Sequence, residues 1–413
     1  MNQSHDLKSL ARSLARLPRA ARARRRTPLG AMALAVLAAG APAAKAGSGV
    51  TVFKDKAGDS ISLFGIIDAG MLYQSNSTNA NGTIGSSITR LAENGRRESE
   101  WGIKGQSGDL GIGGHTTAFF NLESHFSTTT GELFGTGDVV SQPTPLFRRQ
   151  SNVGLTGDWG TIIAGRQYGP ALLADIDTEP RRFKEQFSNL YAWAYGTLAT
   201  NNSYLLPQNI NSNNDVGIFF ENALQYRYTW GPVTIGIMHA FGGMNNGFKY
   251  NSVDALGITY NGPIVISGSY QQMVDQITGK KDVVQWSAGF AVPYKAFTFR
   301  TLYIQSRDNY ALTGAPYVKI GAFGAGVSWK WSPRNSATLA YYYNHDQLHS
   351  GDYTHDAILS DDFHATHWVT LYADFAFINQ GPKATILTSI VADGYVQPGV
   401  NTEYVMTGLN FSF

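Results

Sequence analysis

Charged side chains of the kind that line an aqueous passage gather around residues 147–170, FRRQSNVGLTGDWGTIIAGRQYGP. This stretch predicts two short strands joined by a tight Thr-Gly-Asp-Trp-Gly turn, because those residue types favour chain reversal. Arg148, Arg149 and Arg166 fall where the two strands should meet a solvent-filled interior. Guanidinium groups on one wall of a narrow passage create a field that orients water and dipolar solutes, and no covalent bond is needed.

A long polar segment follows this hairpin, roughly residues 169–216, and it has almost no strand pattern. Most connections between elements are only a few residues long, so this length is typical of a functional loop. The segment carries the acids Asp175, Asp177 and Glu179, and a cluster of three bases follows them. We expect the loop to fold back into a β-barrel and to narrow it.

Histidines and acids gather in a second stretch, where His345 and His349 lie four residues apart and further histidines follow. Such spacing can bind zinc. However, no HExxH motif is present, and residues 346–361 are predicted to form a Gly-, Asp- and Ser-rich outer loop whose polar groups are solvated. No Gly-x-Ser-x-Gly turn or comparable nucleophile motif occurs either. We therefore predict no metal site, no cofactor and no catalytic residue.

Residues 1–46 are predicted to be a secretory signal peptide. Seven arginines precede a short apolar run at 29–40 and an Ala44-Lys45-Ala46 site. A positive region, a brief apolar region and an A-x-A site follow one another in this order in signal peptides. The apolar run is too short to span a bilayer. We expect cleavage after Ala46, which leaves one domain at 47–413.

The basic charge of the chain belongs to this predicted signal. Its removal leaves 23 basic and 29 acidic residues, so the formal net charge of +2 becomes −6. An acidic chain gives no support for binding to nucleic acid. The sequence contains no cysteine, so forces other than disulfides must hold the fold in an oxidising compartment.

Alternating apolar and polar residues indicate strands that cross a membrane. The clearest examples are 223–230 and 405–413, and 61–73 shows the same alternation less regularly because Phe64 and Ile66 fall on its polar side. Period-two alternation over about ten residues is what a tilted transmembrane strand needs. A helical membrane protein would need apolar runs of about 20 residues, and 47–413 has none.

The connections between these strands differ systematically in length. Short turns with Gly or Pro, as at 230–232, 261–263 and 332–334, alternate with long polar segments. This asymmetry is typical of an up-and-down barrel with turns at one end and loops at the other, and a soluble sandwich does not require it. The fold class that we predict is all-β: a 16-stranded antiparallel transmembrane β-barrel with its long third loop folded into the lumen. Aromatic residues near strand ends should form girdles at the bilayer boundary.

Several motifs occur together over the chain. They are LFGIIDAG at 63–70, WGIKG at 101–105, DLG at 109–111, FNLES at 120–124, RQ at 149–150, VGL at 153–155, GRQY at 165–168, NALQY at 222–226 and the terminal Phe413. In this order they resemble the Gram-negative general porins, the trimeric 16-stranded diffusion channels of the outer membrane. The resemblance covers essentially all of 47–413. It implies a water-filled channel for passive diffusion of ions and small hydrophilic solutes, and it implies that the protein is not an enzyme.

The resemblance also implies opposing charged walls at a constriction. Basic wall positions are matched by Arg149, Arg166 and Arg227, with Arg148 beside them, and acidic lumen positions by Glu123 and Asp68, while the third loop supplies Asp175, Asp177 and Glu179. One residue departs from the family pattern: Glu100 stands where an arginine commonly precedes Trp-Gly. We expect Glu100 to face the lumen, where its charge would oppose the anion preference of some relatives.

The family further implies partners and a location. The expected partners are two further copies of the chain, outer-membrane lipid and lipopolysaccharide, permeating ions and solutes, and the barrel-assembly machinery, for which Phe413 would be the assembly signal. The expected location is the outer membrane of a Gram-negative cell. Two alternatives stay open: a substrate-specific porin that facilitates one solute class, and a structural or adhesive barrel with a plugged lumen. The aromatic segment LYAWAYGT at 190–197 has no predicted role.

Overall fold

The computed structural model describes residues 49–77, 87–133, 145–184, 186–188, 190, 211–215, 217–245, 247–310, 312–384 and 398–413. The predicted signal peptide and most of the aromatic segment 190–197 lie outside these ranges. The strands are β1 Val50–Lys54, β2 Ser60–Gln74, β3 Ile88–Ala92, β4 Glu100–Gln106, β5 Thr117–His125, β6 Gln150–Gly157, β7 Gly160–Tyr168, β8 Asn214–Asp215, β9 Phe219–Trp230, β10 Val233–Ala240, β11 Val253–Asn261, β12 Val265–Val274, β13 Lys281–Tyr294, β14 Phe297–Asn309, β15 Pro316–Trp329, β16 Asn335–Asp346, β17 Tyr353–His364, β18 Val369–Gln380 and β19 Thr402–Ser412. Helix α2 spans Pro170–Asp175.

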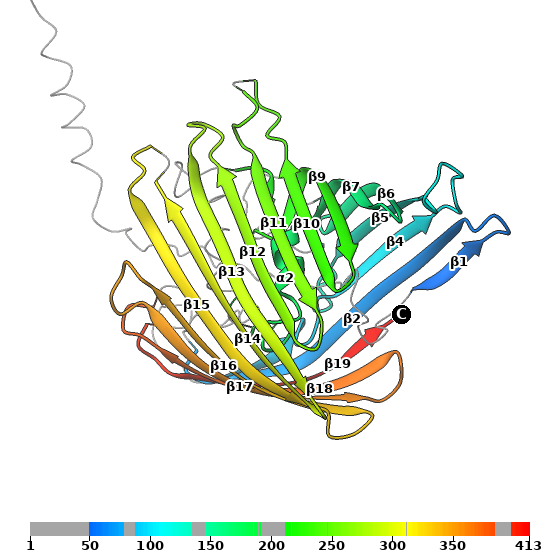
Figure 1. The fold of residues 1–413 in the computed structure, drawn as a ribbon. Coiled ribbons are helices and arrows are strands. Elements are labelled where there is room, and N and C mark those ends of the chain that lie inside the picture. The colour runs from blue at the N-terminus through cyan, green and yellow to red at the C-terminus, as the bar shows by residue number, and fades with distance from the viewer. Residues whose placement is uncertain are drawn as a thin grey trace, which may run out of the picture.

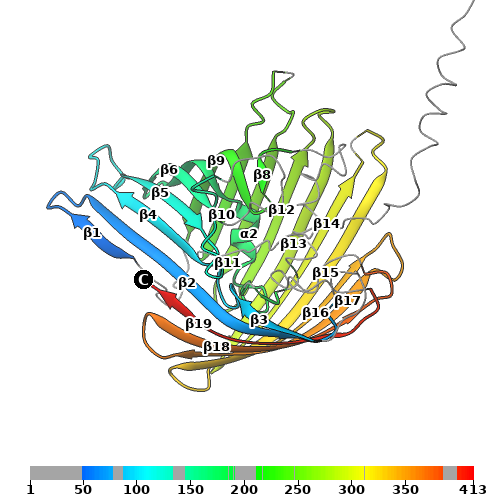
Figure 2. The ribbon, with the colours of Figure 1, turned by 180° about the vertical axis from the view of Figure 1, so that it is seen from behind.

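Sixteen of these strands form a closed antiparallel barrel (Figures 1 and 2). The barrel runs from β2 through β4 to β7 and then from β9 to β19, and each strand is hydrogen-bonded to the next in the chain. Strand β19 pairs with β2 and closes the ring. The short strands β1, β3 and β8 are additions that pair with β2, β2 and β9. The predicted all-β, 16-stranded, up-and-down barrel is therefore confirmed.

Side chains alternate between two environments along each long strand. On β18, Leu371 and Phe375 are exposed on the outside, and Tyr372 and Asp374 between them are buried on the inside. This follows from the pleat, which sends successive side chains to opposite faces. As for helices, none in the described part of the chain is long and apolar enough to cross a membrane.

The packing inside the barrel explains why two apolar residues occur on the inner, mostly polar face of β2. Phe64 and Ile66 point inward and are buried. The Phe64 ring lies against Gly102 of β4, where a Cβ would come within 2.3 Å of Phe64 Cζ. The alternation of this strand is therefore irregular because an aromatic side chain packs on the inner face of the wall, over a glycine.

The ends of the barrel differ as the sequence predicts. From β9 onward, five connections have five residues or fewer, and they alternate with five that have six or more. Exposed tryptophans lie at or beside the short turns, at 230, 329, 331 and 368. These are positions where a bilayer boundary would surround the rings.

One stretch differs from its prediction. Residues 346–361 were expected to form an outer loop, but most of them belong to strand β17. Thr354, Asp356 and Ser360 face inward and are buried, while Ala357 and Leu359 face outward. Because the inner face of a barrel is polar, the strand carries as many polar residues as a loop would.

The seam of the barrel lies where the last residue meets the first long strand. Phe413 N donates to Gly65 O at 3.0 Å, and Gly65 N donates to Phe413 O at 3.2 Å. The Phe413 ring lies over Gly65, where a Cβ would be 2.6 Å from Phe413 Cζ. The glycine therefore makes room for the terminal ring.

We predict that changes at this seam lower the yield of folded barrel. Gly65→Ala forces the ring or the strand to move, at a cost of about 1–3 kcal/mol, and deletion of Phe413 removes the ring and both hydrogen bonds. Less of either variant should be recovered from the outer membrane in the form that migrates as folded protein on unboiled gels. Gly268→Ala is the matched control, because the nearest atoms to its added Cβ lie at 3.7 Å. Equal yields of all three variants would show that the seam does not limit folding.

Candidate functional site

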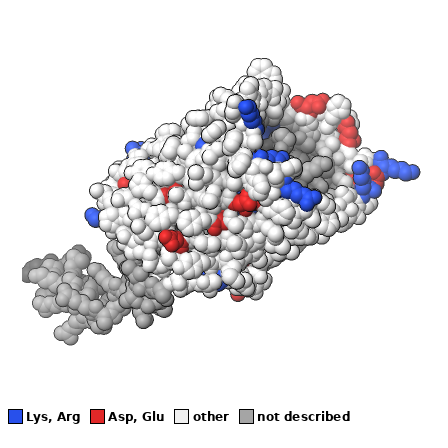
Figure 3. Space-filling model, turned by 90° about the horizontal axis from the view of Figure 1, so that it is seen from below, with Lys and Arg blue, Asp and Glu red and all other residues white. Residues whose placement is uncertain are grey.

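Charged side chains are sparse on the flank of the barrel. The flank seen in Figure 3 is mostly uncharged and carries a few acidic side chains, whereas basic and acidic side chains lie around the hollow at one end. The inner wall combines the inward-facing residues of the strands with the segment that follows β7, so a solute inside would meet both.

Arg149 lies at the start of β6 and is fully buried among acids. Its guanidinium forms ion pairs with Glu98, Glu100 and Glu123, and the distance from Arg149 Nη2 to Glu100 Oε2 is 2.8 Å. It also donates to the hydroxyl of Tyr168. Glu100 lies on the inner side of β4, where it is buried against an arginine instead of standing in water.

Asp68 of β2 is also fully buried, and it joins distant parts of the wall. Its carboxylate accepts hydrogen bonds from Tyr372 Oη at 2.7 Å and Asn410 Nδ2 at 2.9 Å. The backbone nitrogens of Gly95 and Arg97 also donate to it. Asp68 therefore ties the segment between β3 and β4 to the seam of the barrel.

The other three predicted arginines lie on or beside the same wall. Arg166 of β7 pairs with Glu221 at 2.7 Å and donates to the carbonyl of Arg148. Arg227 of β9 faces inward, half-buried, and donates to Gln225 Oε1 at 3.2 Å. The structure brings Arg148, Arg149 and Arg166 together and leaves Arg227 further along the wall.

The segment after β7 lies against the inner faces of distant strands. Asp175, at the end of α2, is buried and accepts a hydrogen bond of 2.7 Å from Ser287 Oγ of β13. Glu179 is buried too and accepts a bond of 2.6 Å from the hydroxyl of Tyr342 of β16. The carbonyl oxygen of Pro170 would be 2.0 Å from a Cβ on Gly257, so only glycine lets α2 pack this closely on β11.

Burial changes the acidity of these loop carboxyls. It raises the pKa of Asp175 to about 7, although hydrogen bonds from three serines lower it in part. It also raises the pKa of Glu179. An acid whose pKa is near 7 carries only part of its charge at neutral pH, so Asp175 adds less to the field inside the barrel than a fully ionised acid would.

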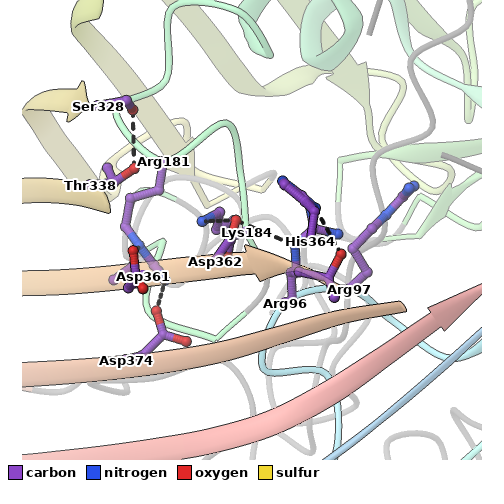
Figure 4. Close-up of polar contacts among 12 residues, drawn as sticks. Arg96, Arg97, Arg181, Lys184, Ser328, Thr338, Asp361, Asp362, His364 and Asp374 are labelled. Carbon is purple, nitrogen blue, oxygen red and sulfur yellow. Dashed lines mark hydrogen bonds and ion pairs between the residues drawn. The ribbon is translucent and has the colours of Figure 1, made fainter. Parts of the chain in front are cut away.

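Two bases share one acid in the part of the wall that Figure 4 shows. Lys184 Nζ lies 2.7 Å from Asp362 Oδ2, and Arg96 Nε lies 3.4 Å from the same oxygen. The exposed fractions of the side chains are 18% for Lys184 and 20% for Arg96, but only 5% for Asp362. Arg97 and His364 lie beside them (Figure 4). Positive charge therefore remains in excess where water can reach.

A second group repeats this pattern on the neighbouring wall. Arg182 Nη2 lies 2.7 Å from Asp177 Oδ1, with 38% and 27% of the two side chains exposed. Arg300 of β14 donates to the carbonyl of Asp177 at 3.2 Å and to Ser328 Oγ at 2.9 Å. Again two guanidinium groups surround one partly exposed acid.

Sequence reasoning passed over most of these exposed bases. Arg96, Arg300 and Asp362 lie in three separate regions of the chain, and none belongs to a motif. The one available signal was the run of bases that includes Arg182 and Lys184, directly after the loop acids. Among the described residues, no group of three or more His, Asp or Glu side chains is placed to hold a metal ion.

Comparisons with known proteins give one consistent picture. A family model described as Gram-negative porin matches residues 33–382. Outer membrane porin protein 32 of Delftia acidovorans is 25% identical over 402 residues, which cover 92% of this chain and 99% of that protein.

Solved structures show the same fold at low sequence identity. An anion-selective porin from Comamonas acidovorans has a TM-score of 0.69 at 20% identity, covering 86% of this chain and all of that one. OmpF of Salmonella typhi in complex with daunomycin has a TM-score of 0.58 at 12% identity, covering 88% and 100%. A trimer form of OmpT from Vibrio cholerae has a TM-score of 0.56 at 9% identity, covering 86% and 99%.

We predict that Arg149 is needed for the stability of the wall. Arg149→Met leaves three buried acids without their shared cation, and removing one partner of a buried ion pair typically costs about 3–5 kcal/mol. The variant should unfold at a lower temperature, measured by the loss of folded migration on gels after graded heating. Arg227→Met, which removes an arginine that is only half-buried, is the control. Equal melting temperatures for the two variants would contradict this role.

Proposed function

This chain belongs to the Gram-negative porins, and we propose that its channel prefers small anions. The barrel forms a water-filled passage through the outer membrane, by which ions and small hydrophilic solutes diffuse passively. The observation that carries the proposed preference is the unequal exposure of opposite charges: inside the barrel, acids are mostly buried, and several bases are partly exposed.

The buried acids support this preference because their charges are already compensated. Glu100 and Glu123 share Arg149, and Asp374 pairs with Arg181 at 2.8 Å. Neighbouring side chains cover these buried pairs, so an ion in the passage meets a charge and its counter-charge together. Glu100, which the sequence suggested would oppose anions, therefore contributes little to the potential that a solute meets.

The partly exposed bases act differently. Lys184 and Arg96 share the single carboxylate of Asp362. The formal charges of these three side chains add up to about +1. Two unit charges 4 Å apart interact by about 1 kcal/mol in bulk water and by about 4 kcal/mol at an effective dielectric constant of 20. A base on a low-dielectric wall thus attracts a passing anion enough to raise its local concentration.

The charged residues of the wall and the loop have two roles in this proposal. The buried ones hold the wall and the loop segment in place, and they are Asp68, Glu100, Glu123, Arg149, Arg166, Asp175 and Glu179. The partly exposed ones meet the solute and set its charge preference, and they are Arg96, Asp177, Arg182, Lys184, Arg227 and Arg300. The loop segment narrows the passage, because α2 and the residues after it stand between the solute and β11 to β16.

General diffusion fits the described wall better than facilitation of one solute. The partly exposed bases come from β14 and two connecting segments, and they form two groups around different acids, Asp362 and Asp177. The anion-selective porin that shares this fold supports the charge preference. In liposome swelling, uptake that falls smoothly with solute size supports diffusion, whereas saturation by one solute would favour a substrate-specific porin.

Assembly and export belong to the same proposal. A homotrimer is supported by the trimer form of one solved neighbour. Residues 1–46 would direct export, and the assembly machinery would read the strand that ends in Phe413. The transport is passive, and we propose no catalytic activity.

The bases that share Asp362 should set the ion preference. The double variant Arg96→Gln with Lys184→Gln should shift the reversal potential in a KCl gradient toward cation preference. The shift should be smaller at high salt, since the Debye length falls from about 10 Å at 0.1 M to about 3 Å at 1 M. Lys295→Gln, an exposed base in the short turn between β13 and β14, is the control and should shift it less. An unchanged potential in the folded double variant would refute anion preference at this wall.

Two acids of the loop segment, Asp175 and Asp177, lie two positions apart in the sequence and give a second test. Asp177→Asn leaves Arg182 and Arg300 without an acid between them, so it should raise anion preference. Asp175→Asn should change the preference less, because this carboxyl is fully buried and burial raises its pKa to about 7, so it is only partly charged at neutral pH. The measurement is again the reversal potential at neutral pH. A larger effect from Asp175→Asn than from Asp177→Asn would contradict the two roles.

A further inference from the structure

The ladder beside β2 is interrupted by a short excursion of the chain. Both β3 and β4 pair with the same edge of β2: Ala92 of β3 lies opposite Gly70, and Glu100 of β4 lies opposite Ile66. Seven residues, 93–99, therefore stand against only three residues of β2, 67–69. We call residues 93–99 the inner bulge, because they contact side chains on the inner face of the barrel wall.

The backbone of β2 keeps its hydrogen bonds where the ladder is interrupted. Asp68 N donates to Ser99 Oγ at 3.0 Å, and Ser99 Oγ donates to Asp68 O at 3.3 Å. Thr128, which follows β5, also donates through Oγ1 to Asp68 O at 2.7 Å. At membrane depth, irregular backbone is tolerated only where it is buried in protein or lines a water-filled cavity. Two hydroxyl groups thus replace the missing strand, and they make the inner bulge compatible with a wall that spans lipid.

Tyr372 holds the inner bulge against the inner face of β18. Its hydroxyl lies among three glycines: a Cβ would be 2.4 Å from Tyr372 Oη on Gly95, 2.9 Å on Gly70 and 2.2 Å on Gly408. The same hydroxyl donates to the carboxylate of Asp68, which also accepts the backbone N–H of Gly95. The position of the inner bulge therefore depends on one phenol group that the glycines of three segments accommodate.

The inner bulge and the third-loop segment meet at one carboxylate. Arg96 Nε of the bulge lies 3.4 Å from Asp362 Oδ2, and Lys184 Nζ of the loop segment lies 2.7 Å from the same oxygen (Figure 4). The bulge is anchored by Tyr372 of β18, and the loop segment by Tyr342 of β16. Two inserted segments with separate anchors thus bring one base each to the same point of the wall.

We propose that the inner bulge is a second inserted element of the channel, which sets the charge of the passage together with the third loop, and that Asp68 and Tyr372 are its positioning residues. Sheet bulges re-aim side chains and are over-represented beside functional sites. Here the bulge directs Arg96 into the passage, and the hydroxyl of Tyr372 keeps it there. The inference rests on the proposed function only for the sign of the native preference, because a charge at residue 96 acts on anions and cations alike.

Cysteine modification of the folded channel tests where residue 96 lies. The chain contains no cysteine, so Arg96→Cys carries a single thiol. In planar bilayers, a methanethiosulfonate reagent that attaches an ammonium group should shift the reversal potential toward anion preference, and one that attaches a sulfonate should shift it toward cation preference. Both should lower the conductance, since each adds volume to the passage. Lys295→Cys, in the exposed turn between β13 and β14, is the control and should give smaller shifts.

A second comparison tests the positioning residues. Tyr372→Phe keeps the ring and removes its hydrogen bond to Asp68. Combined with Arg96→Cys, it should reduce the difference between the reversal potentials that the two reagents produce. Gly95→Ala, whose added methyl group would meet the Tyr372 hydroxyl, should reduce this difference as well. Tyr226→Phe removes a hydroxyl bond of 2.6 Å to Trp159 O on the outer face and should leave the difference unchanged.

The outcomes separate this inference from the proposed anion preference. Equal reversal potentials with the two reagents at residue 96, or shifts as large at residue 295, would overturn the inner bulge as a part of the passage. A difference that survives Tyr372→Phe undiminished, even if the channel melts at a lower temperature, would overturn the positioning role. If the native channel prefers cations but the reagents still shift its potential in opposite directions at residue 96, the anion preference fails and the inner bulge stands. Migration on unboiled gels verifies that each variant is folded.

Discussion

The structure depends on one constraint: inside lipid, every backbone amide and carbonyl must find its partner within the protein. A sheet satisfies this only when it has no open edge, so the last strand must return to the first. Here β19 pairs with β2 from Ile66 to Gln74, and the hydrogen bonds between Phe413 and Gly65 end the seam. The exposed β1 continues along the same edge of β2 beyond the terminal residue. Closure therefore fixes the last residue of the chain as firmly as any residue in the middle of a strand.

Closure of the barrel also determines where charged side chains can lie. A closed ring of sixteen strands has an inner face that lipid cannot reach. The inward-facing side chains of each strand can therefore be polar without being exposed to lipid. Most acids are then used to hold the structure together: Asp68 joins β2 to β18 and β19, and Glu179 fixes the loop segment to β16. Bases such as Lys184 remain partly in water. The proposed preference for anions is thus a consequence of which charges the fold uses for its own stability.

The fold could be predicted from the sequence because its determinants are local. Alternation with a period of two and turn residues at regular intervals are visible in a window of ten residues, and they require no knowledge of distant contacts. The charged wall could not be predicted in the same way. Arg149 was identified as a wall residue from its motif, but whether it faces water or three acids depends on where Glu98 and Glu100 lie in the folded chain. Asp362 was missed for a related reason, since β17 carries the polar composition of a loop.

Strand β14 shows how its pairing register determines which side chains face the passage and which face outward. Arg300 and Arg307 are seven residues apart, an odd number, so one faces the passage and the other faces the boundary with lipid. A shift of the pairing by one residue would exchange every side chain of the strand between the two faces. Arg300 would then point outward near the turn end of the barrel, where a charge on the lipid face is destabilising by an amount that grows with depth. Leu302 and Ile304, now buried inside, would leave that packing. The residues on the two faces of β14 therefore together specify the register in which the strand can pair.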